Sequence, residues 1–131
     1  MKVMITCALL VVSLAACRED ETVRAFGGAD QVWTLTELNG ASFPATATLT
    51  FPKPGEIVGQ GPCNRYFGAM TAPYPWFDTG PIGSTRMACP DLAVETTFLT
   101  ALEAATLSEV AGNTLILSNT DGLEMVFRGT D

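Results

Sequence analysis

The sequence predicts a mainly β fold, a small antiparallel meander that forms a barrel-like curved sheet with one inserted α-helix at about residues 90–106. Short runs of alternating apolar and polar residues recur along the chain, which is typical of half-buried strands. Glycine, proline and asparagine turn signals separate these runs at intervals of about 8–12 residues, as in barrels and strongly curved sheets. Only one stretch changes to a helical spacing of apolar residues, so a single helix is expected.

The first half of the chain contains four predicted strands. The first covers residues 32–38 and ends at the turn signal Asn39-Gly40. The second covers residues 46–51 and alternates most clearly, with its apolar side chains expected to face the core. Those apolar residues are Ala47, Leu49 and Phe51. Strands at residues 56–59 and 64–69 follow, after the turn at residues 52–55.

Residues 71–82 interrupt this regular pattern. They contain Pro73, Pro75 and Pro81, and proline cannot donate a ladder hydrogen bond inside a sheet. The segment is therefore predicted to be an edge strand or an irregular loop.

The helix is predicted from apolar residues that recur at about 3.6-residue spacing between residues 90 and 106. They are Leu92, Phe98, Leu99, Leu102 and Ala105. Pro90 and Asp91 precede them, and both residue types favour the first turn of a helix.

Three strands are predicted in the C-terminal part of the chain. Residues 107–111 and 114–118 flank Gly112-Asn113, and residues 123–128 follow Asp121-Gly122. Both dipeptides are typical of two-residue hairpin turns. These strands complete the meander after the helix.

The N-terminus has the pattern of a bacterial lipoprotein signal. Lys2 precedes an apolar run at residues 3–16, which is shorter than the roughly 20 residues that span a bilayer. Small residues then lead into Cys17, as in a lipobox, where the cysteine thiol is acylated and becomes the new N-terminus. An ordinary signal peptide, with Cys17 incidental, is the alternative. Cleavage after residue 16 would leave 131 − 16 = 115 residues.

The predicted organisation is therefore a signal peptide at residues 1–16, a lipidated flexible tether at residues 17–30 and one domain at residues 31–131. The tether is inferred from its charged and then glycine-rich composition, REDETVRAFGGAD after Cys17. About 115 residues suffice for a single domain with a modest core.

Composition excludes several classes of function. The chain has a net charge of −7, and loss of Lys2 leaves 6 basic and 14 acidic residues, or 6 − 14 = −8. This balance argues against nucleic acid and against a polybasic membrane patch, so membrane attachment is expected through the lipid. The chain contains no histidine, which removes Ser-His-Asp and Cys-His catalysis and histidine-containing zinc sites. No metal or other cofactor is expected.

Four motifs in order resemble the META domain, also called the HslJ-like family. They are VWTLTELNG, TLTF, GQGPCNRYFGAM and GSTRMACPDLAVETTFLTALE, and the resemblance covers residues 31–128. It implies a small antiparallel β barrel-like sheet with one helix. Members are linked to stress and antibiotic tolerance and to secretion or virulence, without established catalytic residues to carry over. YPWFDTGP at residues 74–81 departs from the regular strand expected there.

Cys63 and Cys89 are the thiols that remain in the mature domain. Export favours an oxidising compartment, so a disulfide between them is expected. It would close a loop of 89 − 63 + 1 = 27 residues. A reactive thiol pair and a shared metal site are the alternatives.

The charged residues near the two cysteines form the other candidate site. Arg65 and Arg86 would be brought near each other by the disulfide, and Glu95 lies on the apolar face of the predicted helix. A structural ion pair between arginine and Glu95 is expected, with an anion-binding pocket or solvated charges as alternatives. Asn64 follows a glycine-rich turn and is expected to cap it.

The expected function is that of a non-enzymatic envelope lipoprotein, a stress-related binding or interaction module, monomeric and facing the periplasm. Arg18 after Cys17 favours the outer membrane under the enterobacterial sorting rule. The alternative is a β-barrel carrier of a small ligand, whose cavity Trp33, Trp76, Tyr66 and Tyr74 would line. These aromatic residues are instead expected to fill the core. The interior is therefore predicted to lack a ligand cavity, leaving the outer surface for an unknown envelope partner.

Overall fold

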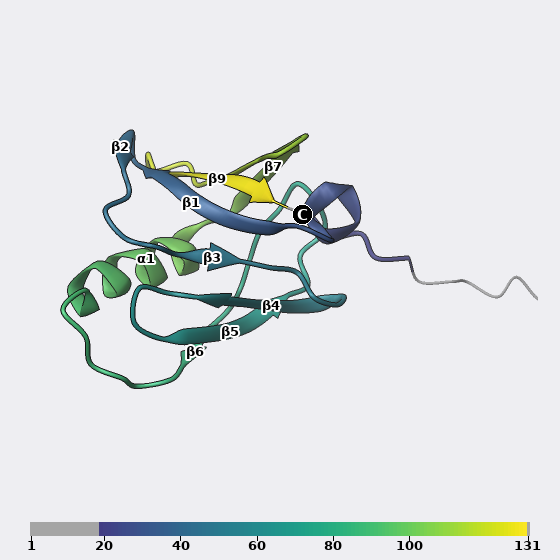
Figure 1. The fold of residues 1–131 in the computed structure, drawn as a ribbon. Helices are drawn as coiled ribbons and strands as arrows, with labels where there is room; N and C mark the ends of the chain where they lie inside the picture. Colours follow the sequence, from purple (N-terminus) through teal and green to yellow (C-terminus); the bar gives the residue numbers. More distant parts are fainter. Residues whose placement is uncertain (1–18, 131) are drawn as a thin grey trace, which may run out of the picture.

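Two antiparallel sheets and the helix α1 are the main elements of the protein, seen here in a computed structural model that describes residues 19–130 (Figure 1). The elements in chain order are η1 (Arg24–Gly28), β1 (Val32–Leu38), β2 (Ala41–Ser42), β3 (Thr48–Leu49), β4 (Gly55–Gln60), β5 (Arg65–Met70), β6 (Gly83–Ser84), α1 (Leu92–Ala104), β7 (Leu107–Ala111), β8 (Thr114–Ser118) and β9 (Glu124–Thr130). The mainly β fold with one inserted helix is confirmed.

The larger sheet has the strand order β2-β1-β9-β8-β7, and β3 pairs with β1 beside β2. Leu35 of β1 and Leu115 of β8 both lie opposite Phe127 of β9, so the three strands place apolar residues on one face. A bulge between Leu35 and Glu37 shifts the register of β1 and bends the sheet. The alternation that predicts these strands therefore builds one wall of the core.

The smaller sheet has the order β4-β5-β6 and contributes the opposite wall of the core. Ile57 and Tyr66 point inward from β4 and β5 and are fully buried. Gly59 lies opposite Tyr66, where a Cβ atom would collide with the tyrosine ring and with the carbonyl oxygen of Thr48. Glycine at this position lets the hydroxyl of Tyr66 reach Thr48, to whose carbonyl oxygen it donates a hydrogen bond.

The sheets do not close into a barrel, so the barrel-like part of the prediction is corrected to two curved sheets. An isolated bridge between Thr50 and Val58 links the segment after β3 to β4, and another joins Trp76 of the 71–82 loop to Leu107 of β7. The predicted strand at residues 46–51 shortens to β3, and residues 71–82 form no extended strand. The prolines of that segment lack the N–H groups that a closing strand would have to donate.

The helix is shorter than the 90–106 predicted, because Ala105 turns to an extended conformation before β7. Its buried residues are Glu95, Phe98, Ala101 and Leu102. The ring of Phe98 packs edge-on against Tyr66 at a centroid distance of 5.5 Å and tilts against Phe43 at 6.1 Å. These rings, together with Trp33 and Phe127, fill the interior between the sheets.

Residues 21–28 are packed against the domain, which corrects the flexible tether predicted through residue 30. Val23 is fully buried, and the indole Nε1 of Trp33 donates to the carbonyl oxygen of Gly28 at 3.0 Å. Arg24 donates from Nε to the carbonyl oxygen of Phe51, and the N–H of Tyr74 donates to that of Glu21. The charged and glycine-rich composition predicted a flexible segment, because Val23 is the only buried apolar side chain within residues 21–28. The predicted signal peptide and lipidated Cys17 lie outside the described residues.

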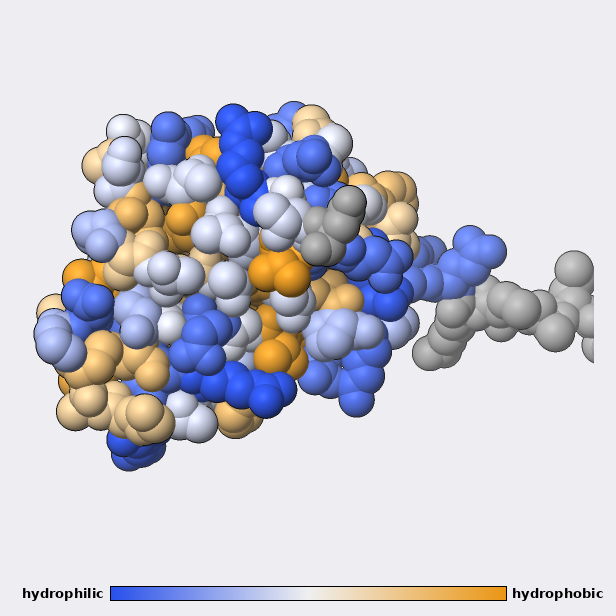
Figure 2. Space-filling view, in the orientation of Figure 1, coloured by the Kyte–Doolittle hydropathy of each residue, from blue (hydrophilic) through white to orange (hydrophobic). Residues whose placement is uncertain are grey.

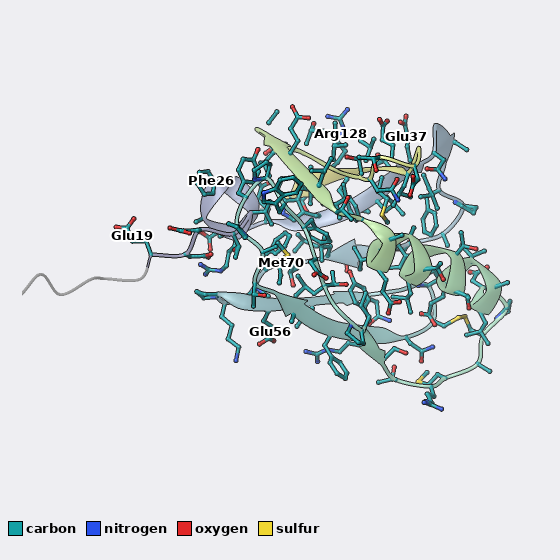
Figure 3. All side chains as sticks on the ribbon, turned by 180° about the vertical axis from the view of Figure 1, so that it is seen from behind. Glu19, Phe26, Glu37, Glu56, Met70 and Arg128 are labelled. Atoms are coloured by element: carbon teal, nitrogen blue, oxygen red, sulfur yellow. A yellow bond between two sulfur atoms is a disulfide. The ribbon has the colours of Figure 1, made fainter. Side chains whose placement is uncertain are left out.

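The described chain starts at one end of the molecule, and the start of α1 lies at the other (Figure 1). The view from behind shows the same separation, with Glu19 at the left end of the molecule and the disulfide at the right end (Figure 3). No helix within residues 19–130 is long and apolar enough to cross a bilayer.

Candidate functional site: a buried carboxylate behind an exposed loop

The disulfide between Cys63 and Cys89 is present and joins the β4–β5 turn to residues 85–91, hereafter the 85–91 loop. The two Cα atoms are 5.7 Å apart. This loop connects β6 to α1, so the bridge brings the start of the helix close to the start of β5. The two cysteine-containing motifs of the sequence therefore meet at one place.

Glu95 is a buried carboxylate at this meeting point, with 3% of its surface exposed. Its Oε1 atom accepts hydrogen bonds from the backbone N–H groups of Cys63 and Asn64, at 3.0 and 2.6 Å. Its Oε2 atom accepts one from Nδ2 of Asn64 at 2.7 Å. Charge-assisted bonds of this kind offset the desolvation of a buried carboxylate. Both oxygens are thus engaged by the protein itself.

Asn64 connects the helix to the 85–91 loop and is also 3% exposed. Its Nδ2 atom donates to the carbonyl oxygen of Met87 as well as to Glu95. Its Oδ1 atom accepts from the Met87 N–H at 2.6 Å and from the Thr85 hydroxyl at 3.0 Å. The predicted capping role is corrected, because these partners lie more than twenty residues away along the chain rather than in the adjacent turn.

Gly61 makes room for the carboxylate. A Cβ atom at this buried glycine would lie 2.5 Å from Oε1 of Glu95 and 3.1 Å from the carbonyl oxygen of Asn64. Both atoms are fixed by hydrogen bonds, so neither can move aside cheaply. The GQGPCN segment thus combines a close approach, a disulfide and a buried amide within six residues.

Arg65 and Arg86 do not form the ion pair with Glu95 that the sequence suggested. Within residues 19–130 the ion pairs are Arg24–Asp20 and Lys53–Glu56. Both predicted arginines are exposed, and they border different surface hollows rather than one anion pocket. The physical reason is that nearer backbone and amide donors already occupy the oxygens of Glu95.

A hollow of about 330 Å³ lies between the 85–91 loop and α1. Met87 and Leu92 border it, and their side chains are 66% and 44% exposed. Figure 2 shows weakly hydrophobic residues gathered at the end of the molecule that carries this loop. Met87 was not singled out from the sequence, although its position two residues before Cys89 was a usable signal.

The titratable groups near the core are engaged in structural contacts. Burial raises the pKa of Tyr66 far above its ordinary value, and its hydroxyl donates to a backbone carbonyl. Trp33 and Tyr66 are core residues as predicted, whereas Trp76 is 58% exposed. No group of three potential metal ligands of the His, Cys, Asp or Glu type occurs in the described part of the chain.

Comparisons with known proteins agree on the fold. An NMR structure of a protein from Burkholderia xenovorans is 24% identical, with a TM-score of 0.64, and the match covers 88% of this chain and 93% of that chain. A second NMR structure is 18% identical, with a TM-score of 0.59, covering 75% and 87%. A comparison with curated proteins finds no match. The sequence profile of the META domain matches residues 27–131. This match spans most of the chain, and the protein therefore belongs to the META domain family.

Proposed function

We propose that this protein is a non-enzymatic, lipid-anchored module of the cell envelope that binds a protein partner. The binding surface is the 85–91 loop together with the exposed face at the start of α1. One observation carries the proposal: the side chain of Met87 is 66% exposed, while its backbone N–H and carbonyl are both held by the buried Asn64. A loop held in this way presents an exposed apolar side chain from a fixed backbone.

Preorganisation of this kind favours binding because little conformational entropy remains to be lost on association. Methionine and arginine are enriched in protein interfaces, and methionine adapts to irregular apolar surfaces. Arg86 and Met87 are adjacent and exposed on the loop. Met87 and Leu92 therefore supply an apolar centre, with a cation beside it.

The neighbouring surface of α1 is exposed but carries little charge. Its residues are Ala93, Thr96, Thr97 and Thr100. The hydroxyls of Thr96 and Thr97 donate back to carbonyl oxygens of the helix, which lowers the polarity of this face. A surface depleted of charged side chains suits the centre of a protein interface.

Catalysis is not proposed, because the carboxylate and the two cysteines of the site are engaged in hydrogen bonds and a disulfide that stabilise the fold. Glu95 is fully hydrogen-bonded, and Cys63 and Cys89 are joined. The chain contains no histidine to act as a base at neutral pH. The proposed role is recognition, as part of a stress response of the envelope.

The membrane anchor is proposed from the lipobox at residues 14–17, and the first prediction tests it. Intact-mass measurement of protein from the membrane fraction should show a chain that begins at Cys17 and carries the mass of acyl chains. Cys17→Ala should move the protein out of the membrane fraction, whereas Cys63→Ala should not. A mature chain that begins elsewhere without lipid would contradict the anchor. The Arg18 residue predicts recovery with the outer membrane rather than the inner membrane.

The second prediction tests the binding surface in the lipidated chain. A photo-crosslinking amino acid at position 87, introduced into cells of the source bacterium, should give a protein adduct of one defined mass. The same amino acid at position 76 is the matched control, since Trp76 is similarly exposed but pairs with Leu107 at the start of β7 rather than with the elements that hold the loop.

The yield of the adduct should also depend on the neighbouring residue Leu92. Leu92→Asp should lower its yield about tenfold, because an interface hot spot contributes roughly 1–2 kcal/mol or more. Equal adducts at positions 76 and 87, or no effect of Leu92→Asp, would contradict the proposed surface.

A further inference from the structure

The distance between the proposed lipid and the folded domain is very short. Cys17 precedes Asp20 by three residues, so their Cα atoms are at most about 10–11 Å apart even in a fully extended chain. The inference developed here rests on the lipid anchor of the proposed function. A chain acylated at Cys17 cannot move its domain far from the bilayer.

Asp20 is already part of the folded structure. Its Oδ1 atom accepts hydrogen bonds from the N–H and the hydroxyl of Thr22, at 2.9 and 2.6 Å, and Oδ2 lies 3.6 Å from Nη1 of Arg24. Burial acts to raise the pKa of Asp20, but the Thr22 hydrogen bonds and Arg24 outweigh it and lower that pKa below its usual range. Val23, directly after Thr22, is fully buried. Asp20 is therefore joined by local contacts to a segment that the buried Val23 holds on the domain.

The surface around this exit point, hereafter the anchor end, is formed by residues 19–22, 26, 54–55 and 71–74. Segments far apart in sequence line one hollow of about 900 Å³ here, with Pro54, Thr71 and Pro73 beside residues 19–22. The N–H of Tyr74 donates to the carbonyl oxygen of Glu21 at 2.7 Å. The short tether would place this end of the molecule, rather than α1, against the bilayer.

An aromatic pair of one exposed ring, Phe26, and one half-buried ring, Tyr74, lies at the anchor end. Phe26 is 54% exposed, and its ring stacks on Tyr74 with a centroid distance of 4.7 Å and an interplanar angle of 10°. The Tyr74 hydroxyl in turn accepts a hydrogen bond from the N–H of Val110, so the pair is fixed to β7. Figure 3 shows Phe26 at the same end of the molecule as Glu19. Aromatic rings with a polar neighbour are favoured at the headgroup level of bilayers.

The anchor end carries a net negative charge. Arg24 pairs with Asp20, and Lys53 pairs with Glu56 at 3.1 Å beside the same hollow. Glu19 and Glu21 remain as exposed carboxylates. An anionic lipid surface would repel these two groups, whereas zwitterionic headgroups would not. The chemistry of this end therefore fits a zwitterionic bilayer surface.

We propose that the anchor end docks on the zwitterionic headgroups of the bilayer through the Phe26–Tyr74 pair. The tether of three residues supplies a high effective concentration, which one aromatic pair alone would not achieve. Docking would point the 85–91 loop and the start of α1 away from the membrane, because they lie at the opposite end of the molecule (Figure 1). The bilayer contact thus orients the proposed binding surface toward the periplasm.

The test uses the full lipidated chain in vesicles of phosphatidylethanolamine and phosphatidylcholine that contain spin-labelled phosphatidylcholine. In a Trp76→Phe background, tryptophan is introduced at position 26 or at position 87, and the buried Trp33 gives a common background signal. Lipid quenching of the Phe26→Trp variant should exceed that of the Met87→Trp variant several-fold. Both exposed positions are matched in solvent access but lie at opposite ends.

A second variant tests whether the short tether is needed to keep the anchor end at the bilayer. Inserting twenty glycine and serine residues between Arg18 and Glu19 adds a flexible linker with a root-mean-square length of about 25 Å. Quenching of the Phe26→Trp signal should then fall to the level of position 87. Replacing half of the zwitterionic lipid by phosphatidylglycerol should also reduce it.

Each result decides the proposal. Equal quenching at positions 26 and 87, or none at position 26 in acylated protein, would overturn docking and leave the partner surface untouched. Loss of the position-87 crosslink with quenching intact would overturn the partner surface alone. A chain without acyl groups at Cys17 would overturn the anchor and the docking together.

Discussion

Replacing Glu95 by glutamine is expected to lower the free energy of unfolding by about 2–4 kcal/mol. Glu95 now accepts hydrogen bonds with both oxygens from Cys63 and Asn64. A glutamine would turn its NH₂ group either toward Nδ2 of Asn64 or toward the two backbone N–H groups. In each orientation one hydrogen-bond donor faces another, so at least one hydrogen bond is lost. Denaturant titration of the oxidised protein measures the loss, and exposed Glu109 changed to glutamine serves as the matched control.

The same geometry predicts a partial rescue. Asn64→Asp should be strongly destabilising alone, because its carboxylate would face Oε2 of Glu95. Combined with Glu95→Gln, the new aspartate could accept from the new amide, although the carbonyl oxygen of Met87 would still lose its donor. A coupling energy of about 1 kcal/mol or more is expected from the double-mutant cycle. Additive effects would contradict the direct contact.

Loss of the disulfide is expected to cost about 3–4 kcal/mol, from the entropy of a closed loop of roughly this length. Cys63→Ser and Cys89→Ser should be destabilised by similar amounts, since each removes the same bridge. The backbone N–H of residue 63 can still donate to Glu95 in the first variant. Urea unfolding of both variants under non-reducing conditions measures the effect.

Reduction provides the control for the bridge. Dithiothreitol should destabilise the wild-type protein to the level of the two serine variants and leave those variants unchanged. Peptide mapping of oxidised, folded protein should recover Cys63 and Cys89 in one linked peptide. Two free thiols in that material would contradict the bridge.

Much of the fold could be predicted from the sequence because its strands bury one face. Ala47, Leu49 and Phe51 are all buried, as their alternation predicts, although only Thr48–Leu49 forms a strand there. The strands β2 and β6 were missed because two residues carry no periodicity. Their pairing depends on partners that the sequence does not identify.

The candidate site was predicted only in part, for a physical reason. Glu95 was noticeable as a carboxylate on an apolar helix face, and the two cysteines were paired correctly. The partners of Glu95 were predicted to be arginine side chains, because a buried carboxylate is expected to pair with a cation. The actual donors include backbone N–H groups of Cys63 and Asn64, which every residue except proline possesses and which no sequence pattern distinguishes.

The Asn64–Glu95 cluster holds the backbone of the exposed 85–91 loop in one conformation. Amide hydrogen exchange of Met87, followed by NMR, tests it most directly, because this N–H donates to Asn64 although its side chain is exposed. The Met87 amide should exchange slowly in the wild-type protein and much faster in Glu95→Gln, while the amide of Leu117 in β8 keeps its protection under conditions where both proteins are folded. Exchange at the rate of an unstructured peptide in the wild-type protein would contradict the claim.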